Sequence, residues 1–277
     1  MTHNVTIIDV WNVDTFDANL CGYLDAQADD ISNYMLTSRR QELEYGASDH
    51  NNPLPANPYA DAFNGVTEHI MGLMEVRTIR AWHYTRQTDG EIDALRKHGI
   101  YLSSLETIRT RFAAQVTEGA LSQEVAERLF VDSPYQSSQF AARADKFWMV
   151  SHPIEINHSG VIPLLESWGG ESAYFSQRNT ELRDMLKRIG LPRVLEIAVP
   201  LVHSRHSYSA AAAVAATYGR TLGCQPDKHS FDLYIEQPLG PDHIIAIHSQ
   251  GEPNFDAIAL DYPSGFVNLD LELWDEE

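Results

Sequence analysis

The sequence predicts an α+β fold, in which strands mix with helices of irregular length instead of alternating regularly with them. Two observations support this. Short apolar runs typical of strands outnumber long helices after residue 78, and residues 1–77 contain two segments with apolar side chains at helical spacing. The chain has 277 residues, 43% of them hydrophobic, which is enough to bury a core. We expect a mostly helical N-terminal extension, 1–77, followed by a mixed domain, 78–277.

The extension begins with VTIIDVW, residues 5–11, which predicts a short strand. Leu20, Leu24 and Ile31 then recur at helical spacing and predict a helix over 16–45. Three prolines between residues 47 and 58 indicate a loop. A second helix is predicted over 59–75.

The mixed domain opens with a strand over 78–84, and Asp89 is expected to cap a helix over 90–98 that ends at Gly99. A helical region follows over 104–130, then a loop over 132–139 and a buried strand over 146–156. GGESAYFS, 169–176, predicts a turn and a strand. Further helices are predicted over 161–168, 180–189 and 207–223, and further strands over 194–202, 231–239 and 243–249.

The C-terminal segment shows the clearest alternation of apolar and polar residues. Val267, Leu269, Leu271 and Leu273 are separated by polar side chains, a pattern typical of a strand with one wet face. DAIALDY, 256–262, precedes a Pro-Ser-Gly turn. We therefore expect a β-hairpin over 256–273.

The formal charge of −19 is unevenly distributed. Residues 1–77 hold 12 acidic and three basic residues, and 251–277 hold eight acidic residues and no basic one, whereas 78–250 is nearly balanced. The field of such a chain opposes a broad nucleic-acid footprint, yet its middle can accept an anionic ligand. A protein acceptor is therefore favoured, although one basic group could still reach nucleic acid: Arg178, Arg183, Lys187, Arg188 and Arg193.

The sequence also indicates where the protein works. No apolar run approaches 18 residues, so we expect no membrane span, and the N-terminus lacks the pattern of a secretory signal. Two cysteines, Cys21 and Cys224, cannot form a disulfide framework and are expected to be reduced, as in a cytoplasmic protein.

Several common catalytic motifs are absent from the sequence. The twelve histidines form no H-E-x-x-H frame and no C-x-x-C accompanies them, so no metal site is predicted. No P-loop, G-x-G-x-x-G loop or G-x-S-x-G elbow occurs.

Three separated stretches suggest a different chemistry. In AWHYTRQTDGEIDALRKHGI, 81–100, a strand ends in His83, Tyr84 and Thr85, and a helix and Gly-Ile follow. The second stretch is Gly-preceded and contains Ala173, Tyr174, Phe175 and Ser176. The third places Glu236 on a late strand shortly before Pro241-Asp242-His243-Ile244.

Together these stretches resemble the ADP-ribosyltransferase superfamily, in its branch with a His-Tyr-Glu triad that includes poly(ADP-ribose) polymerases and diphtheria-type toxins. The resemblance covers residues 78–250, with an inserted helical segment over 104–145. It implies a split, mixed and antiparallel sheet with helical insertions. It also implies that NAD is the substrate.

The resemblance assigns roles to particular residues. Glu236 would stabilise the positive charge that develops on the ribose as nicotinamide departs, with Glu166 and Glu171 as alternative acids. His83 would hydrogen-bond a ribose hydroxyl, backbone groups near Tyr84 and Thr85 would hold the carboxamide, and Arg86 would meet the pyrophosphate. Tyr174 would stack on the nicotinamide ring, with Phe175 and Ser176 beside it.

The implied function is transfer of ADP-ribose from NAD to a macromolecule, as in a bacterial toxin or a phage-defence effector. Two alternatives stay open. The chain could hydrolyse NAD with water as acceptor, or it could be a catalytically silent module that binds NAD or ADP-ribose.

Overall fold

A computed structural model describes residues 6–46, 54–137, 140–175 and 177–267. The chain divides into two compact units. The first contains the described residues up to Arg80, Pro200–Phe231 and the described residues from Tyr262; the second contains Ala81–Val199 and Asp232–Asp261. The division at Arg80 lies three residues beyond the expected boundary at 77. The first unit also includes a segment after residue 200 that the sequence analysis had assigned to the mixed domain.

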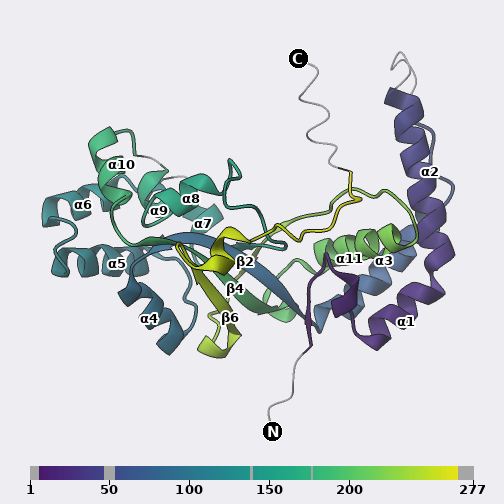
Figure 1. Ribbon diagram of the computed structural model, residues 1–277, viewed down its shortest axis with the longest axis horizontal. Coiled ribbons are helices and arrows are strands. Elements are labelled where there is room, and N and C mark those ends of the chain that lie inside the picture. Colours follow the sequence, from purple (N-terminus) through teal and green to yellow (C-terminus); the bar gives the residue numbers. More distant parts are fainter. Residues whose placement is uncertain (1–5, 47–53, 138–139, 176, 268–277) are drawn as a thin grey trace, which may run out of the picture. The chain divides into compact units, whose positions relative to one another are not determined.

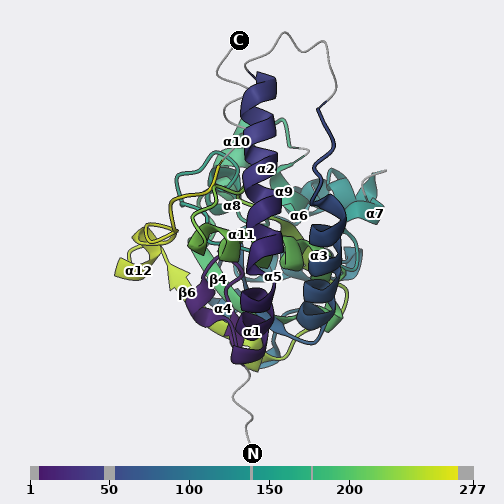
Figure 2. The same cartoon turned by 90° about the vertical axis from the view of Figure 1, so that its right-hand side faces the viewer.

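The first unit is mainly helical. Its elements are β1 (Ile7–Ile8), η1 (Val13–Thr15), α1 (Ala18–Ala26), α2 (Ala28–Gly46), α3 (Ala60–Glu75), η3 (Leu201–His203) and α11 (Ser207–Thr221). The alanine-rich α11 packs against α3 and α2, as Figures 1 and 2 show. Its small side chains allow the neighbouring helices to approach closely. Nine of the ten residues from 210 to 219 are buried. Asp17 caps α1 and forms a 2.7 Å ion pair with Arg77.

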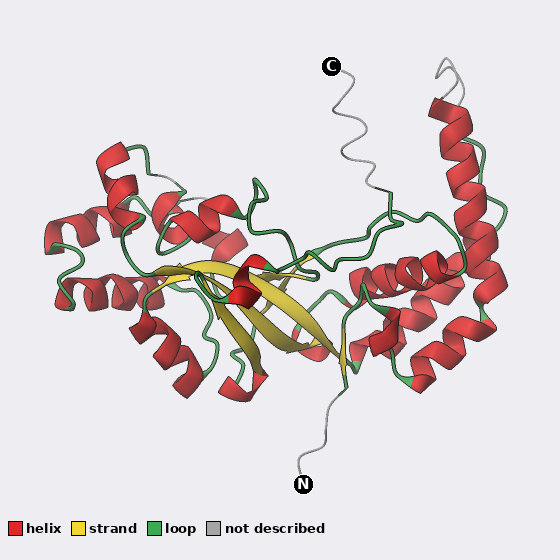
Figure 3. Ribbon diagram, in the orientation of Figure 1, coloured by secondary structure: helices red, strands yellow, loops and turns green. Residues whose placement is uncertain are grey.

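The second unit contains most of the sheet. Its strands are β2 (Thr78–Gln87), β3 (Phe147–Val150), β4 (Leu191–Pro200), β5 (Asp232–Ile235) and β6 (Ile244–Ser249). The first three residues of β2 and the last residue of β4 belong to the first unit. The strand order is β5-β3-β2-β4-β6, and β1 pairs in parallel with the start of β2. Figure 3 shows this sheet with its strands in yellow. The α+β prediction is confirmed.

Helices of the second unit cluster around the sheet. They are α4 (Asp89–His98), α5 (Leu105–Thr117), α6 (Gln123–Val131), η2 (Pro134–Gln136), α7 (Phe140–Arg143), α8 (Ile162–Glu166), α9 (Glu171–Tyr174), α10 (Thr180–Leu186), η4 (Pro241–His243) and α12 (Pro253–Asp256). The elements from α5 to α7 occupy the segment 104–145 that the sequence predicted as a helical insertion.

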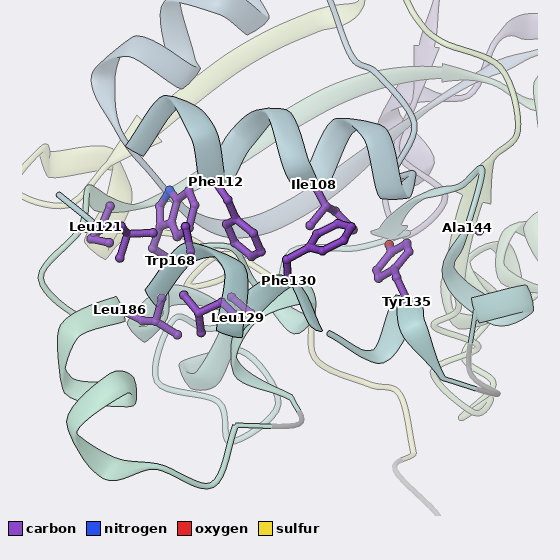
Figure 4. Packing of buried hydrophobic residues seen from close by; sticks show 12 residues of the cluster. Ile108, Phe112, Leu121, Leu129, Phe130, Tyr135, Ala144, Trp168 and Leu186 are labelled. Atoms are coloured by element: carbon purple, nitrogen blue, oxygen red, sulfur yellow. The ribbon is translucent and has the colours of Figure 1, made fainter. Parts of the chain in front are cut away.

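A hydrophobic cluster joins these helices (Figure 4). Phe112 of α5 packs against Trp168, with ring centroids 5.6 Å apart, and Trp168 is completely buried. Leu129 and Phe130 of α6 and Leu186 of α10 belong to the same cluster. The cluster therefore packs the insertion against residues 168–189, which fixes the position of α5 and of the residues that α5 presents to the site described below.

The strand register brings three chain segments into one row. Trp82 of β2 pairs with Val150 of β3, and Val150 pairs in turn with Asp232 of β5, both antiparallel. Neighbouring strands lie about 4.8 Å apart, so the backbones of Trp82 and Asp232 are about 10 Å apart. Residues distant in sequence are thereby placed on adjacent strands at the same level of the sheet.

Several element predictions differ from the structure. The helix expected over 16–45 is divided into α1 and α2 at Gln27. Thr88, not Asp89, caps α4, because its side chain accepts a hydrogen bond from the Glu91 amide in a reciprocal capping box. Residues 171–174 form the helix α9 instead of a strand, since the glycines before them adopt positive φ and turn the chain into a helix.

The predicted C-terminal hairpin is wrong in its first half. Residues 257–261 form turns after α12. Val267 forms an isolated parallel bridge with Asp227. The rest of the predicted hairpin, 268–273, lies outside the described residues.

Candidate functional site

The second unit contains a cavity of about 570 Å³ beside β2 and β3. Its walls come from both strands, from α5, and from the segments around residues 154–164 and 169–172. Many of the lining side chains are aromatic: Trp82, His83, Tyr84, Tyr101, Tyr135, Phe147 and Trp148. The volume lies within the range of sites for small molecules and cofactors, and rings of this kind suit a ligand that carries flat heterocycles.

His83 lies in the cavity wall with one ring nitrogen fixed. Its Nδ1 is 2.8 Å from the carbonyl oxygen of Trp148, and its ring lies 4.3 Å from that of Phe147. A carbonyl oxygen only accepts, so Nδ1 carries the proton and Nε2 is left as an acceptor. Burial, aided by the charge of Arg111, lowers the pKa of His83 to about 4, even though the hydrogen bond to Trp148 acts in the opposite direction. His83 is therefore a neutral hydrogen-bond acceptor at pH 7.

Tyr84 hydrogen-bonds the backbone of Ile154, in a segment that lines the cavity. Its hydroxyl donates to the carbonyl oxygen of Ile154 at 2.7 Å and accepts from the amide of Ile154 at 2.6 Å. Burial raises the pKa of Tyr84, so the hydroxyl stays protonated. Ile154 itself lines the cavity. The large side chain of Tyr84 thus positions the wall opposite β2.

Arg111 presents a cation to the cavity from α5. Its Nε and one terminal nitrogen lie 2.8 and 2.7 Å from Oε1 of Glu91. The other oxygen of Glu91 accepts from Trp168 Nε1 and from the Thr88 amide, both at 2.8 Å. Burial alone would raise the pKa of Glu91, but these partners together lower it. The guanidinium is consequently held by a fully engaged carboxylate at the start of α4.

Of the acidic residues considered for catalysis, some line the cavity and others lie elsewhere. Asp232 and Glu171 line it, and Glu171 forms a 2.9 Å ion pair with Arg143, which also lines it. Glu236 is exposed just beyond the C-terminal end of β5 and is not among the lining residues. Glu166 is paired with Lys187 at 3.1 Å and does not line the cavity either.

Other predicted site residues are distributed as follows. His83, Tyr84 and Thr85 line the cavity. Arg86 does not: its Nε donates instead to the carbonyl oxygen of Ile189 at 2.8 Å.

The Tyr-Phe-Ser stretch lies behind the wall. Tyr174 packs against the hydrophobic cluster and does not line the cavity, whereas the glycines at 169 and 170 do. Phe175 is 48% exposed and lies under the guanidinium of Arg143, 4.8 Å from its ring centroid. Ser176 lies outside the described residues. The structure therefore does not bring His83, Tyr174 and Glu236 together around this cavity.

The lining residues with polar groups that sequence reasoning missed include Asp232, Arg111, Arg143 and Gln87. A signal was available for Asp232, because it begins the same strand, FDLYIE, on which Glu236 was chosen. Gln87 follows His83 and Thr85 at strand spacing and could have been found once β2 was extended beyond residue 84. Nothing in the sequence distinguished Arg111 from Arg109, the other arginine of α5.

The described residues contain no group of three or more His, Cys, Asp or Glu side chains arranged to hold a metal ion. Within the same part of the chain, no helix combines the length and apolar character needed to cross a membrane. Comparisons with models of protein families, with curated proteins and with solved structures found no match.

Proposed function

We propose that this cavity binds NAD, that the protein cleaves the nicotinamide–ribose bond, and that it transfers ADP-ribose to a macromolecular acceptor. The observation that carries the proposal is the presence of both a neutral imidazole, His83, and a carboxylate, Asp232, among the residues that line one cavity rich in aromatic side chains. The resemblance of residues 81–100 to the first motif of the ADP-ribosyltransferases adds to it.

The chemistry requires a negative charge near the sugar. When the bond between C1′ and the pyridinium nitrogen breaks, its electron pair stays with nicotinamide, which leaves as a neutral molecule. Positive charge is left on the ribose, and the acceptor then bonds to C1′ and loses a proton to solvent. A carboxylate preorganised beside the ribose stabilises this charge, and the effect grows as the bound substrate displaces water from around it.

Asp232 fits this role better than Glu236 does. It lines the cavity, whereas Glu236 does not. It is level with Trp82 in the row that runs across β2, β3 and β5, so its side chain is on the same side of the sheet as that of Trp82, and residues on both sides of β2 line the cavity. Glu236 follows the opposite end of β5, beyond Ile235, whose partner is Phe147. Glu171, named as an alternative acid, also lines the cavity, but its ion pair with Arg143 offsets its charge.

The other walls supply the remaining contacts. Nε2 of His83 accepts a hydrogen bond from a ribose hydroxyl. The rings of Trp82, Phe147 and Trp148 offer faces for nicotinamide in place of Tyr174. Arg111 and Arg143 line the cavity and take the place proposed for Arg86. Each already has a carboxylate partner, Glu91 and Glu171 respectively, so a pyrophosphate would bind through the guanidinium nitrogens that those carboxylates do not engage.

The test measures nicotinamide released from NAD by the purified protein, with and without cell lysate. Asp232→Asn should reduce release by about 100-fold or more, since it removes the charge and keeps the shape. Glu236→Gln is the matched substitution at the other end of β5 and should retain release. The reverse pattern would return the catalytic role to Glu236.

The fate of the sugar separates the alternatives. Adenine-labelled NAD is incubated with lysate, and label retained on macromolecules supports transfer. Label found only in free ADP-ribose means hydrolysis. Binding of NAD without any nicotinamide release would overturn the proposed enzyme in favour of a silent binding module.

A further inference from the structure

Glu91 does not line the candidate cavity, yet its carboxylate contacts three of the segments that do. Its Oε1 lies 2.8 and 2.7 Å from Nε and Nη2 of Arg111 on α5. Its Oε2 accepts from the amide of Thr88, which directly follows β2, and from Nε1 of Trp168, which directly precedes Gly169, both at 2.8 Å. A single side chain therefore joins the end of β2, α5 and the segment after Trp168 from behind the cavity.

The contacts with Glu91 engage only one edge of the guanidinium of Arg111. Nε and Nη2 face Oε1, and Nη2 is enclosed by protein. Nη1, in contrast, hydrogen-bonds no described residue and is not one of their enclosed polar atoms. Since Arg111 lines the cavity, Nη1 is the nitrogen that a ligand there can reach. The guanidinium carbon also lies 5.3 Å from the centroid of the Trp168 ring, so Trp168 contacts both members of the pair.

The charge of Glu91 and its geometry affect an anionic ligand in opposite directions. Glu91 is ionised, because the charge of Arg111 and the hydrogen bonds to the carboxylate lower its pKa in spite of burial, and its negative charge repels an anion. Its contacts, however, hold a long and flexible side chain in one orientation before the ligand arrives. The planar fork of arginine then loses less conformational entropy when it binds a phosphate.

We infer that Glu91 is a positioning residue that directs Nη1 of Arg111 toward the phosphates of the dinucleotide, an inference that rests on the proposed function. The amide of Thr88 that binds Glu91 is part of the same chain segment as His83. The carboxylate thus fixes the guanidinium relative to the imidazole. Ribose and phosphate are joined covalently in the ligand, so a fixed spacing between the two groups that meet them favours binding.

Glu91→Asp separates orientation from charge, because it keeps the carboxylate and shortens the side chain by one methylene. ADP-ribose is titrated into the protein by calorimetry, well below the unfolding temperature. We expect Kd to rise by about tenfold or more, since Arg111 loses its seat. In the Arg111→Lys background the same substitution should change Kd by less than about twofold, because Glu91 acts through the guanidinium fork.

Thr88→Ala is the matched control for loss of the helix cap. It removes the hydroxyl that accepts from the Glu91 amide, and it leaves the partners of the Glu91 carboxylate in place. It should lower stability and keep the wild-type Kd. The inference is overturned if Glu91→Asp binds ADP-ribose like the wild type, if Thr88→Ala weakens binding as much, or if Glu91→Asp weakens binding equally in the Arg111→Lys background.

A second variant decides the inference if Glu91→Asp fails to fold. Trp168→Phe removes the Nε1 donor to Glu91 and keeps a ring in the hydrophobic cluster. It should raise Kd for ADP-ribose by about threefold or more, because the carboxylate loses one of the partners that hold it. An unchanged Kd in Trp168→Phe would overturn the role of Glu91.

The binding measurement is independent of bond cleavage, which separates this inference from the proposed function. Binding with the expected dependence on Glu91 and Arg111, in a protein that releases no nicotinamide, would overturn cleavage and keep the positioning role. Nicotinamide release by a wild-type protein whose Glu91→Asp variant binds ADP-ribose unchanged would do the reverse. A wild-type protein that does not bind ADP-ribose would overturn both.

Discussion

The imidazole of His83 is kept neutral by its surroundings, and this has a consequence for stability. Burial among aromatic side chains disfavours the charged ring, and Arg111 adds a repulsive charge, so the pKa falls from its usual value near 6.5 to about 4. In the unfolded chain the same histidine takes up its proton near pH 6.5. Between these two values the unfolded state binds more protons than the folded state does.

The free energy of unfolding should therefore fall as pH is lowered from 6.5 to 4, and the contribution of His83 is fully present above pH 6.5. His83→Asn removes the titrating group while keeping a donor for the Trp148 carbonyl. We expect the variant to lose less stability than the wild type when urea unfolding is compared at pH 7 and pH 4.5. Carboxylates titrate equally in both proteins and cancel in this difference.

His98→Asn serves as the control, because His98 is an exposed histidine at the end of α4. This variant should follow the wild-type pH dependence. An unchanged pH dependence in His83→Asn would mean that the ring is protonated in the folded protein at mildly acidic pH, and the assignment of Nε2 as an acceptor would then fail.

At the scale of the element, the end of α4 depends on one glycine. Gly99 has φ of +81° and ends the helix, and a Cβ at this position would meet the carbonyl oxygen of Leu239 and the backbone of Gly240. The adjacent Ile100 and Leu239 exchange two backbone hydrogen bonds, 2.8 and 3.1 Å long. This bridge joins the end of α4 to the segment that leads into β6.

We expect Gly99→Ala to lower the free energy of unfolding by about 2–5 kcal/mol, which combines the left-handed conformation with the backbone clash. Gly119→Ala is a close control: its φ is +78°, but a Cβ there meets nothing within 4 Å. It should cost only about 1–2 kcal/mol. Equal losses in the two variants, measured by urea unfolding, would show that the contact with Leu239 contributes nothing.

At the same scale, the sequence predicted some elements closely and others wrongly. Helices with apolar residues at regular spacing, such as α3 and α11, were predicted within about two residues, because their pattern reflects burial on one side. The stretch at 169–176 was predicted as a strand because Tyr and Phe favour strands, yet two glycines with positive φ start a helix there. Local propensity gave no indication of that turn.

The sequence predicted only those residues of the candidate site that lie close together along the chain. His83, Tyr84 and Thr85 were found because a strand, a turn and a helix follow each other directly in the sequence. Asp232 was missed because its position depends on the register between β5 and β3, which short-range patterns do not specify. Arg111 depends on the packing of an insertion onto Trp168, about 60 residues further along the chain.

At the scale of the whole molecule, the charge of −19 bears on the identity of the acceptor. A polyanion such as RNA is repelled by a chain of this charge, and the repulsion extends about 10 Å at 0.1 M salt. The five clustered basic residues considered from the sequence do not form one cationic surface. Lys187 is paired with Glu166, and Arg193 is buried with Asp89 and Ser249 as its partners.

We therefore predict that the acceptor is a protein. Adenine-labelled NAD is incubated with lysate and the purified protein, and the labelled macromolecules are divided between protease and nuclease treatments. Label should be released by protease and resist nuclease, and the Asp232→Asn variant should leave the macromolecules unlabelled. Nuclease-sensitive label would contradict the prediction. It would then direct attention to Arg178, Arg183 and Arg188, which are exposed, as the contacts for phosphate groups.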